Sequence, residues 1–133
     1  MNYTRVFLAA IAATVADFAY GFVVYGNVLT SSFAAQTLIY RPAQDQMAYM
    51  PIGAAGIFAA MIAASAIYAK GRTGRVIDGA AFGILLGLFM IGACVAVNYA
   101  TINMSGDHGV KMAAAALVEW VIVGVVISLV YRP

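Results

Sequence analysis

Charged residues are scarce in this sequence of 133 residues. Only 9% of them are charged and 65% are hydrophobic, whereas soluble globular chains are about half apolar and about a quarter charged. The formal net charge is +2, and no run of Lys and Arg is interleaved with aromatic residues as a nucleic-acid groove requires. The composition therefore excludes a soluble globular domain, gives no support for a nucleic-acid partner, and predicts a single transmembrane domain over residues 1–133.

Residues that hold metals and prosthetic groups are equally scarce. The chain has one cysteine and one histidine, so there is no disulfide framework, and we expect Cys94 to be a small core side chain. A structural zinc site takes about four ligands; His108 and Asp107 form only a weak metal candidate. We expect Asp107 to cap the fourth helix and His108 to be a solvated loop residue.

Prosthetic groups find little support in the sequence. A haem held by two histidines is excluded within one chain, and no lysine lies at mid-membrane depth for attachment of retinal. No cofactor is predicted. Eight tyrosines, seven phenylalanines and seven methionines would nevertheless suit a hydrophobic groove for a bound lipid, a quinone or a pigment, although such residues more often form core and interfacial belt.

The patterns of nucleophilic and phosphate-handling enzymes are missing as well. No serine stands in a G-x-S-x-G pattern. The glycines of residues 76–100 have transmembrane spacing and no strand before them, so they do not form a phosphate loop. We therefore predict no catalytic residue, and an enzyme is the least favoured function.

Long apolar runs, by contrast, are abundant. A helix of about 20 apolar residues crosses a bilayer, and the sequence predicts four such spans, at about 4–29, 47–69, 76–100 and 111–131. Arg5 and the small residues 12–16 resemble a secretory signal, but the apolar run continues through Val28, so we expect an uncleaved first helix. The predicted fold is all-α: a polytopic membrane protein built as a four-transmembrane-helix bundle.

The segment between the first and second spans has helix-start and helix-stop signals. Residues 30–32 suit an N-cap, and residues 33–40 predict a short interfacial helix that ends at Arg41-Pro42. Pro51 fits the first turn of the second span and would kink a helix that began earlier.

Small residues predict how the spans pack. Glycines at four-residue spacing in the third span leave one face without side chains, and the second span repeats this pattern. The predicted packing residues are Gly56, Ala60, Ala64, Gly79, Gly83 and Gly87. Because only residues 70–75 connect the two spans, we expect them to be the tightest pair. Further small-residue faces, Ala9/Ala13/Ala16 and Ala113/Ala116, predict self-association.

Basic residues predict the orientation. Five lie on the side of the chain termini, namely Arg5, Lys70, Arg72, Arg75 and Arg132, against Arg41 and Lys111 on the other side. The positive-inside rule therefore places both termini in the cytoplasm.

Two carboxylates lie inside the spans, at a cost of about 2.5 to 3.5 kcal/mol each on insertion scales. Asp17 lies twelve residues after Arg5 and Glu119 thirteen before Arg132, which puts both at similar depth, about 18 to 20 Å along their helices. They would form either a proton or cation relay or hydrogen bonds that hold helices together, Asp17 to Tyr20 or Thr14 of a neighbouring helix and Glu119 to a tryptophan indole or the backbone. The second interpretation is favoured. The predicted intramembrane polar residues are Asp17, Glu119, Tyr20, Thr14 and Asn98.

Three stretches carry a resemblance to a known family. They are Tyr20 to Gly26 (YGFVVYG), Gly83 to Leu88 (GILLGL) and Asn98-Tyr99. Together with the small final helix, they resemble a family of short four-helix bacterial inner-membrane proteins known only as a domain of unknown function. The resemblance implies a four-span bundle in a bacterial inner membrane, and it implies neither an activity nor site residues.

Two functions stand as hypotheses. The leading one is a non-catalytic membrane subunit, a homo-oligomer or an accessory chain of a larger complex, which contacts lipid or a hydrophobic cofactor. Its partners would be membrane lipids and either further copies of itself or other membrane subunits. The alternative is a small proton-coupled carrier that uses Asp17 and Glu119.

Overall fold

The predicted all-α fold is confirmed. The computed structural model describes residues 1–71 and 74–132, except the side chain of Ala43, and these residues contain helices and turns but no strand. The elements in chain order are α1 (Tyr3–Val23), the π-helical segment η1 (Val24–Val28), α2 (Thr30–Ala34), α3 (Ala43–Ala69), α4 (Val76–Met90), the π-helical segment η2 (Ile91–Ala96), α5 (Val97–Thr101) and α6 (Gly106–Val130).

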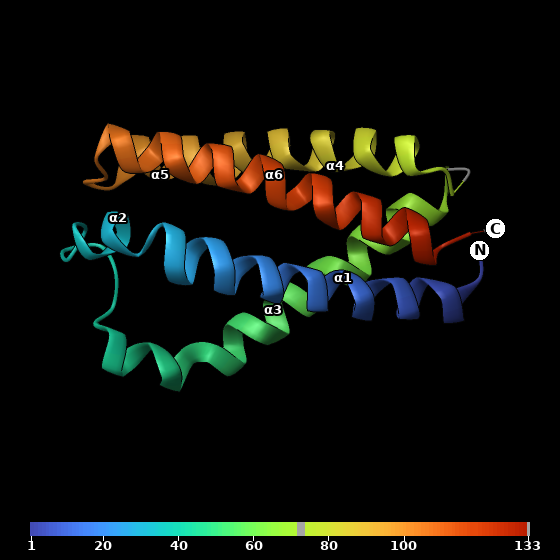
Figure 1. Ribbon diagram of the computed structural model, residues 1–133, viewed down its shortest axis with the longest axis horizontal. Coiled ribbons are helices and arrows are strands. Elements are labelled where there is room, and N and C mark those ends of the chain that lie inside the picture. Colours follow the sequence, from blue (N-terminus) through green and yellow to red (C-terminus); the bar gives the residue numbers. More distant parts are fainter. Residues whose placement is uncertain (72–73, 133) are drawn as a thin grey trace.

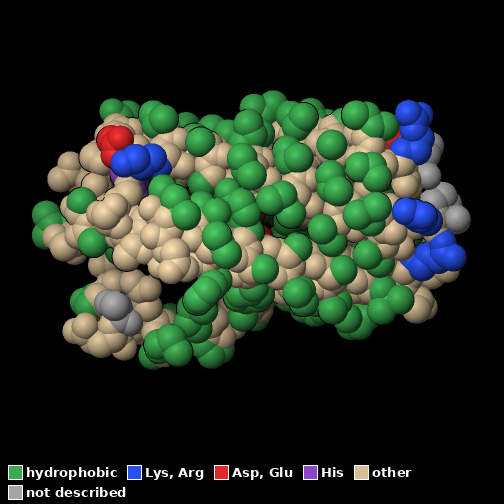
Figure 2. Space-filling model, in the orientation of Figure 1, with side chains coloured by type: hydrophobic (Ala, Val, Ile, Leu, Met, Phe, Trp, Pro, Cys, Tyr) green, Lys and Arg blue, Asp and Glu red, His purple; other side chains and the backbone are tan. Residues whose placement is uncertain are grey.

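Four helices are long and apolar enough to cross a membrane, as an integral membrane protein requires. They are Tyr3–Val28, Gln44–Ala69, Val76–Thr101 and Gly106–Val130. At 1.5 Å per residue, a helix of 25 residues extends over about 38 Å, more than the hydrocarbon thickness of about 30 Å. Hydrophobic side chains cover the middle of the molecule, and Lys and Arg side chains gather at its ends (Figure 2). Arg72, one of the basic residues counted above, lies outside the described residues.

The tightest helix pair is α4 with α6, which lie side by side over most of their length (Figure 1). Gly79, Gly83 and Gly87 are all buried in this interface. A Cβ atom added to Gly83 would lie 2.6 Å from the Cα atom of Val121, and one added to Gly124 would lie 2.8 Å from the Cα atom of Gly83. The glycines of both helices therefore let the two backbones touch, as expected where lipid supplies no hydrophobic drive.

The prediction that the second and third spans form the tightest pair is wrong. α3 packs mainly on α1 and approaches α4 near their connection, where the rings of Tyr68 and Phe82 lie 5.4 Å apart. Ala64 is buried, but Gly56 and Ala60 are exposed. A short connection fixes where two helices join but not their crossing angle. The glycine face of α4 finds the matching Gly124 on α6 instead.

α3 also begins earlier than predicted, so Pro51 lies inside the helix. Proline in a helix interior removes a backbone hydrogen bond and favours a bend. The amino-terminal part of α3 diverges from α1, while its carboxy-terminal part crosses close to it (Figure 1). The segment before α3 also differs from the prediction. In place of an interfacial helix over 33–40, it contains the short helix α2 (Thr30–Ala34). The N-cap of α2 is Leu29, whose side chain makes no capping hydrogen bond.

The core lies where α1 meets α3 and α6. Ala9, Ala10 and Ala13 of α1 are fully buried there. Ala9, Ala13 and Ala116 of the two predicted self-association faces are covered by the chain's own helices, whereas Ala16 and Ala113 are half-buried; self-association itself stays a prediction. Both termini lie at the same end of the bundle (Figure 1), where the backbone nitrogen of Asn2 donates to the Tyr131 hydroxyl (3.4 Å).

Candidate functional site

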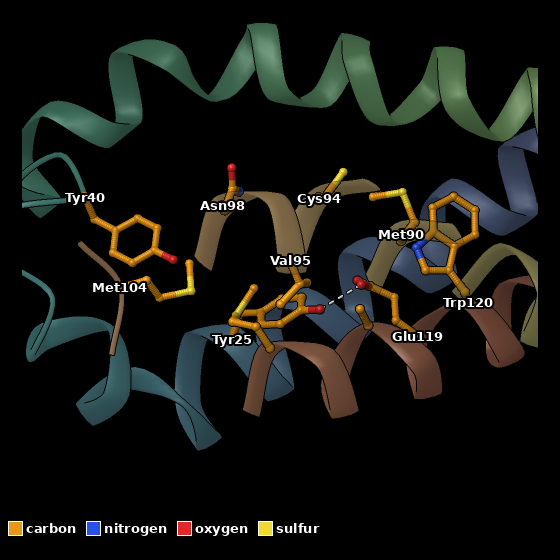
Figure 3. Close-up of a pocket in the computed structure, with 11 residues that line it drawn as sticks. Tyr25, Tyr40, Met90, Cys94, Val95, Asn98, Met104, Glu119 and Trp120 are labelled. Atoms are coloured by element: carbon orange, nitrogen blue, oxygen red, sulfur yellow. Dashed lines mark hydrogen bonds between the residues drawn. The ribbon is translucent and has the colours of Figure 1, made fainter. Parts of the chain in front are cut away.

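The two intramembrane acids lie on one wall of the bundle: Asp17 of α1 and Glu119 of α6 both line the same groove. The hydroxyl of Tyr25 in η1 donates to Glu119 Oε2 (2.7 Å; Figure 3). We refer to Asp17 and Glu119 as the acid pair.

Small residues bring the acid pair together. The buried alanines of α1 remove bulk between α1 and α6, and the Tyr20 hydroxyl donates to the backbone oxygen of Ala115 (2.8 Å), which fixes the two helices one turn away from Glu119. Thr14 donates to Ala10 O within its own helix (2.8 Å). Tyr20 and Thr14 thus bond to backbone oxygens, and Tyr25, which the sequence did not single out, is the partner of Glu119.

Both π-helical segments lie beside Glu119. η1 carries Tyr25, and η2 carries Cys94 and Val95, which line a cavity together with Glu119; Val95 points toward Tyr25 and Glu119 (Figure 3). π-Helical turns are rare and are frequent at functional sites. In η1 the Asn27 side chain donates to Phe22 O (2.7 Å). Such side-chain bonds satisfy backbone oxygens that the wider π turn displaces. In the sequence, the only mark of this π turn is Asn27, a polar residue at the end of an apolar span.

A cavity of about 250 Å³ adjoins the acid pair on the α4 side, and we call it the inner cavity. Its walls come from α4, η2, α5 and α6 together with two tyrosines. Asn98, predicted as an intramembrane polar residue, lines this cavity with Glu119 (Figure 3). Met90, Met104 and Trp120 supply its apolar lining.

A larger groove of about 1050 Å³ opens on the other side of the acid pair, and we call it the lateral groove. It lies between α1, η1 and α2 on one side and α3 on the other, where α3 diverges from α1. Asp17 and Glu119 line its inner part, and Arg41 and Gln46 line it beside the connection to α3. Glu119 and Tyr25 line both the lateral groove and the inner cavity, so the acid pair lies where the two spaces adjoin.

His108 closes the outer end of the site, and its prediction as a solvated loop residue is wrong. It is fully buried in the first turn of α6. Its Nδ1 lies 2.8 Å from Ser32 Oγ and its Nε2 lies 2.8 Å from the Tyr40 hydroxyl. Burial raises the pKa of the Tyr40 phenol. A neutral imidazole donates from one ring nitrogen and accepts at the other, so one of the two hydroxyls accepts from His108 and the other donates to it.

Asp107 does not cap α6 as predicted. The N-cap is Ser105, whose Oγ accepts from the backbone nitrogen of His108 (3.3 Å). Asp107 instead forms an exposed ion pair with Lys111 (2.6 Å). Within residues 1–71 and 74–132, no group of three or more His, Cys, Asp and Glu side chains is arranged to hold a metal ion.

Comparison of the chain with protein-family models, with curated proteins and with solved structures found no match. The resemblance to short bacterial inner-membrane proteins stays a prediction. The function is therefore argued from the geometry of the acid pair and the two spaces beside it.

Proposed function

We propose that this membrane protein is a small proton-coupled carrier in which the acid pair binds a proton and releases it in exchange for a solute. The observation that supports this function is the placement of Asp17 and Glu119, from two different helices, on the wall of one lateral groove. Ionisable groups inside a bilayer are costly and mark ion and proton pathways. An acid pair used only to hold helices together would not need to border an open groove.

The surroundings of the acid pair suit a proton that can leave and return. Tyr25 supplies one hydrogen bond to Glu119, which steadies the carboxylate once the proton is gone. Lys111 pairs with Asp107 in the first two turns of α6, and Glu119 follows Lys111 by eight residues, or about 12 Å along the helix. Among residues 1–71 and 74–132, no basic side chain is bonded to Asp17 or Glu119, so a solute there meets carboxyl groups without a basic competitor.

The π-helical segment η1 provides an element that could change state. A π turn holds one extra residue, and its conversion to α-helix would rotate Tyr25 about the helix axis by roughly 100°. Such a rotation would break the bond between Tyr25 and Glu119 and change which of the two spaces reaches the acid pair. Alternating access in carriers requires a change of this kind around a fixed site.

Reconstitution of acid-pair variants tests this function. Asp17→Asn and Glu119→Gln each remove an ionisable group while keeping the shape of the side chain. We expect each to lower the proton flux at least tenfold in liposomes that contain a pH dye. Asp45→Asn, in the exposed first turn of α3, is the matched control and should transport like the natural chain. Infrared difference spectra should also lose a carboxyl C=O band in the two acid-pair variants. Unchanged flux and unchanged spectra in both would overturn the proposal.

A membrane subunit is the second candidate, supported by the exposed small residues of α3. Gly53, Gly56 and Ala60 are exposed, and nothing lies within 4 Å of a Cβ atom added to either glycine. A second helix could approach closely there. Native mass spectrometry from mild detergent would reveal a dimer or a retained partner, and Gly56→Leu should dissociate it. A monomer with no retained partner would count against this function.

The orientation and the membrane are further parts of the proposal. We infer that the chain lies in a bacterial inner membrane with both termini in the cytoplasm. The support for the orientation is the excess of basic residues at the end that holds the termini and the connection between α3 and α4 (Figure 2); the bacterial inner membrane rests on the family resemblance alone. Labelling of cysteines introduced at each end, in a Cys94→Ala background, tests it in inside-out and right-side-out vesicles.

A further inference from the structure

We propose that the solute exchanged at the acid pair is a lipophilic monovalent cation, which enters the lateral groove sideways from the bilayer. This inference rests on the proposed carrier function and adds the chemical class of the solute. Three features of the groove carry it: its aromatic wall, the charge at its inner part, and the splayed helix that leaves it open.

The wall of the lateral groove is aromatic and continuous. The ring centroids of Tyr25 and Phe33 lie 6.2 Å apart, and those of Phe33 and Tyr40 lie 4.9 Å apart. Phe18 and Phe22 of α1 extend the wall past the acid pair. Aromatic faces carry negative potential and attract cations, most strongly where water is excluded. A volume of about 1050 Å³ suits a drug-sized organic ion.

The charge of the groove is negative at its inner part. Asp17 and Glu119 lie there, and the basic residue that lines the groove is Arg41, next in sequence to Tyr40. The guanidinium of Arg41 stacks on Tyr49, 3.8 Å from the ring centroid. Tyr40 bonds to His108, which precedes Glu119 by eleven residues, or about 16 Å along α6.

The exchange balances in charge. When the proton of the acid pair leaves for water, one carboxylate gains a negative charge that is costly at this depth. A monovalent cation replaces the proton and neutralises this charge, whereas an anion would add to it. The reverse step, protonation, removes the attraction and releases the cation. Binding of a cation should therefore release a proton, and acid should weaken cation binding.

Access from the bilayer follows from the divergence of α3 and α1. Phe22 on α1 and Met50 on α3 both line the groove and are 74% and 49% exposed, so the rim of the groove is apolar and open. A hydrated inorganic ion would lose its water there without replacement ligands, because the groove offers mainly carbon atoms. An organic cation with apolar substituents keeps its favourable contacts along the whole path.

Binding of tetraphenylphosphonium to the full chain in detergent tests the inference, with tetraphenylborate as the anion of matched size and shape. We expect saturable calorimetric binding of the phosphonium only, with proton release seen as a dependence of the heat on buffer ionisation. Trp120, the single tryptophan, lines the inner cavity beside Glu119 and should report binding by fluorescence. Glu119→Gln and Asp17→Asn should each weaken binding at least tenfold.

A second pair of variants keeps the test decisive if the acid-pair variants do not fold. Phe22→Ala removes an exposed part of the aromatic wall and should weaken phosphonium binding about threefold to tenfold. Phe89→Ala, at an exposed position of α4 outside the groove, should leave it unchanged. Equal binding of the borate, or natural affinity in Phe22→Ala, would overturn the inference.

The failure of this inference and that of the carrier function are distinguishable. If flux and the infrared carboxyl band depend on Asp17 and Glu119 but the phosphonium does not bind, the solute class is wrong and the carrier function stands. If neither flux nor the band depends on the two acids, the carrier function is wrong as well.

Discussion

The interface of α4 with α6 and the interface of α3 with α1 are built in opposite ways. Glycines on both sides bring the backbones of α4 and α6 into contact along the helices. α3 meets α1 through larger side chains, such as Phe58, whose ring centroid lies 6.0 Å from that of Phe7, and the amino-terminal part of α3 diverges from α1 (Figure 1). One half of the bundle is closed along its length, and the other half opens into the lateral groove.

The bundle is stable because α4 and α6 pack closely, and it is open because α3 diverges from α1. Close backbone contact gains dispersion energy and weak hydrogen bonds that larger side chains would prevent. The α4–α6 pair therefore holds Glu119 at a fixed depth, and α1 and α3 are left to form the groove around it.

The largest effect is expected at Gly83. In Gly83→Ala the new methyl group would meet the backbone of α6, including Val121 Cα at 2.6 Å, and a backbone atom cannot turn aside. We expect the free energy of unfolding to fall by about 3 kcal/mol, at the upper end of the typical cost of overpacking. The measurement is the unfolding midpoint in mixed micelles, which should be lower.

Gly56→Ala is the matched control on α3. Nothing lies within 4 Å of its new methyl group, so the gain in helix propensity should leave stability unchanged or raise it by up to about 1 kcal/mol. If both substitutions had the same effect, the close packing of α4 and α6 would not be the source of the difference between the two halves.

His108→Leu should have an intermediate effect on stability, because His108 of α6, in the closed half of the bundle, bonds to Ser32 and Tyr40 beside the open half. The substitution leaves the hydroxyls of Ser32 and Tyr40 without their ring partner, at a cost of about 2 kcal/mol. Hydrogen exchange should accelerate over residues 30–42 and not within α4. Asp107→Asn removes only an exposed ion pair one residue away and should change stability by less than about 0.5 kcal/mol. Equal protection of residues 30–42 in both variants would contradict this role of His108.

Much of the fold could be predicted from composition and spacing, since apolar length alone specifies a span. Small-residue spacing identified Gly79, Gly83 and Gly87, which are buried as expected, but it did not identify their partner. Gly124 stands between β-branched residues of α6, and four-residue spacing pairs it only with Ser128, so no longer repeat marked this face. Partner choice depends on the fit of two faces, and one face does not determine the other.

The candidate site was only partly predictable. The helical rise put Asp17 and Glu119 at similar depth, but it left open whether their helices are neighbours; both acids line the lateral groove. Tyr25 could not be placed from helical periodicity, because the π turn of η1 changes the face on which it lies. The surroundings of His108 were missed for a related reason: its partners Ser32 and Tyr40 come from a connection that has no regular period.

The smallest effect, and one of opposite sign, is expected at Ser65. Its hydroxyl lies on the buried face of α3 with Ala64 and Tyr68, and among the described residues it has no hydrogen-bond partner. Ser65→Ala removes this buried polar group and should stabilise the protein by about 1 kcal/mol. Ser128→Ala is the matched control: this hydroxyl donates to Val125 O (2.7 Å) within the α4–α6 interface, so its removal should not stabilise. The unfolding midpoints of both variants are measured in the same micelles. An equal gain in stability for Ser128→Ala and Ser65→Ala would mean that the two halves satisfy their buried polar groups equally well.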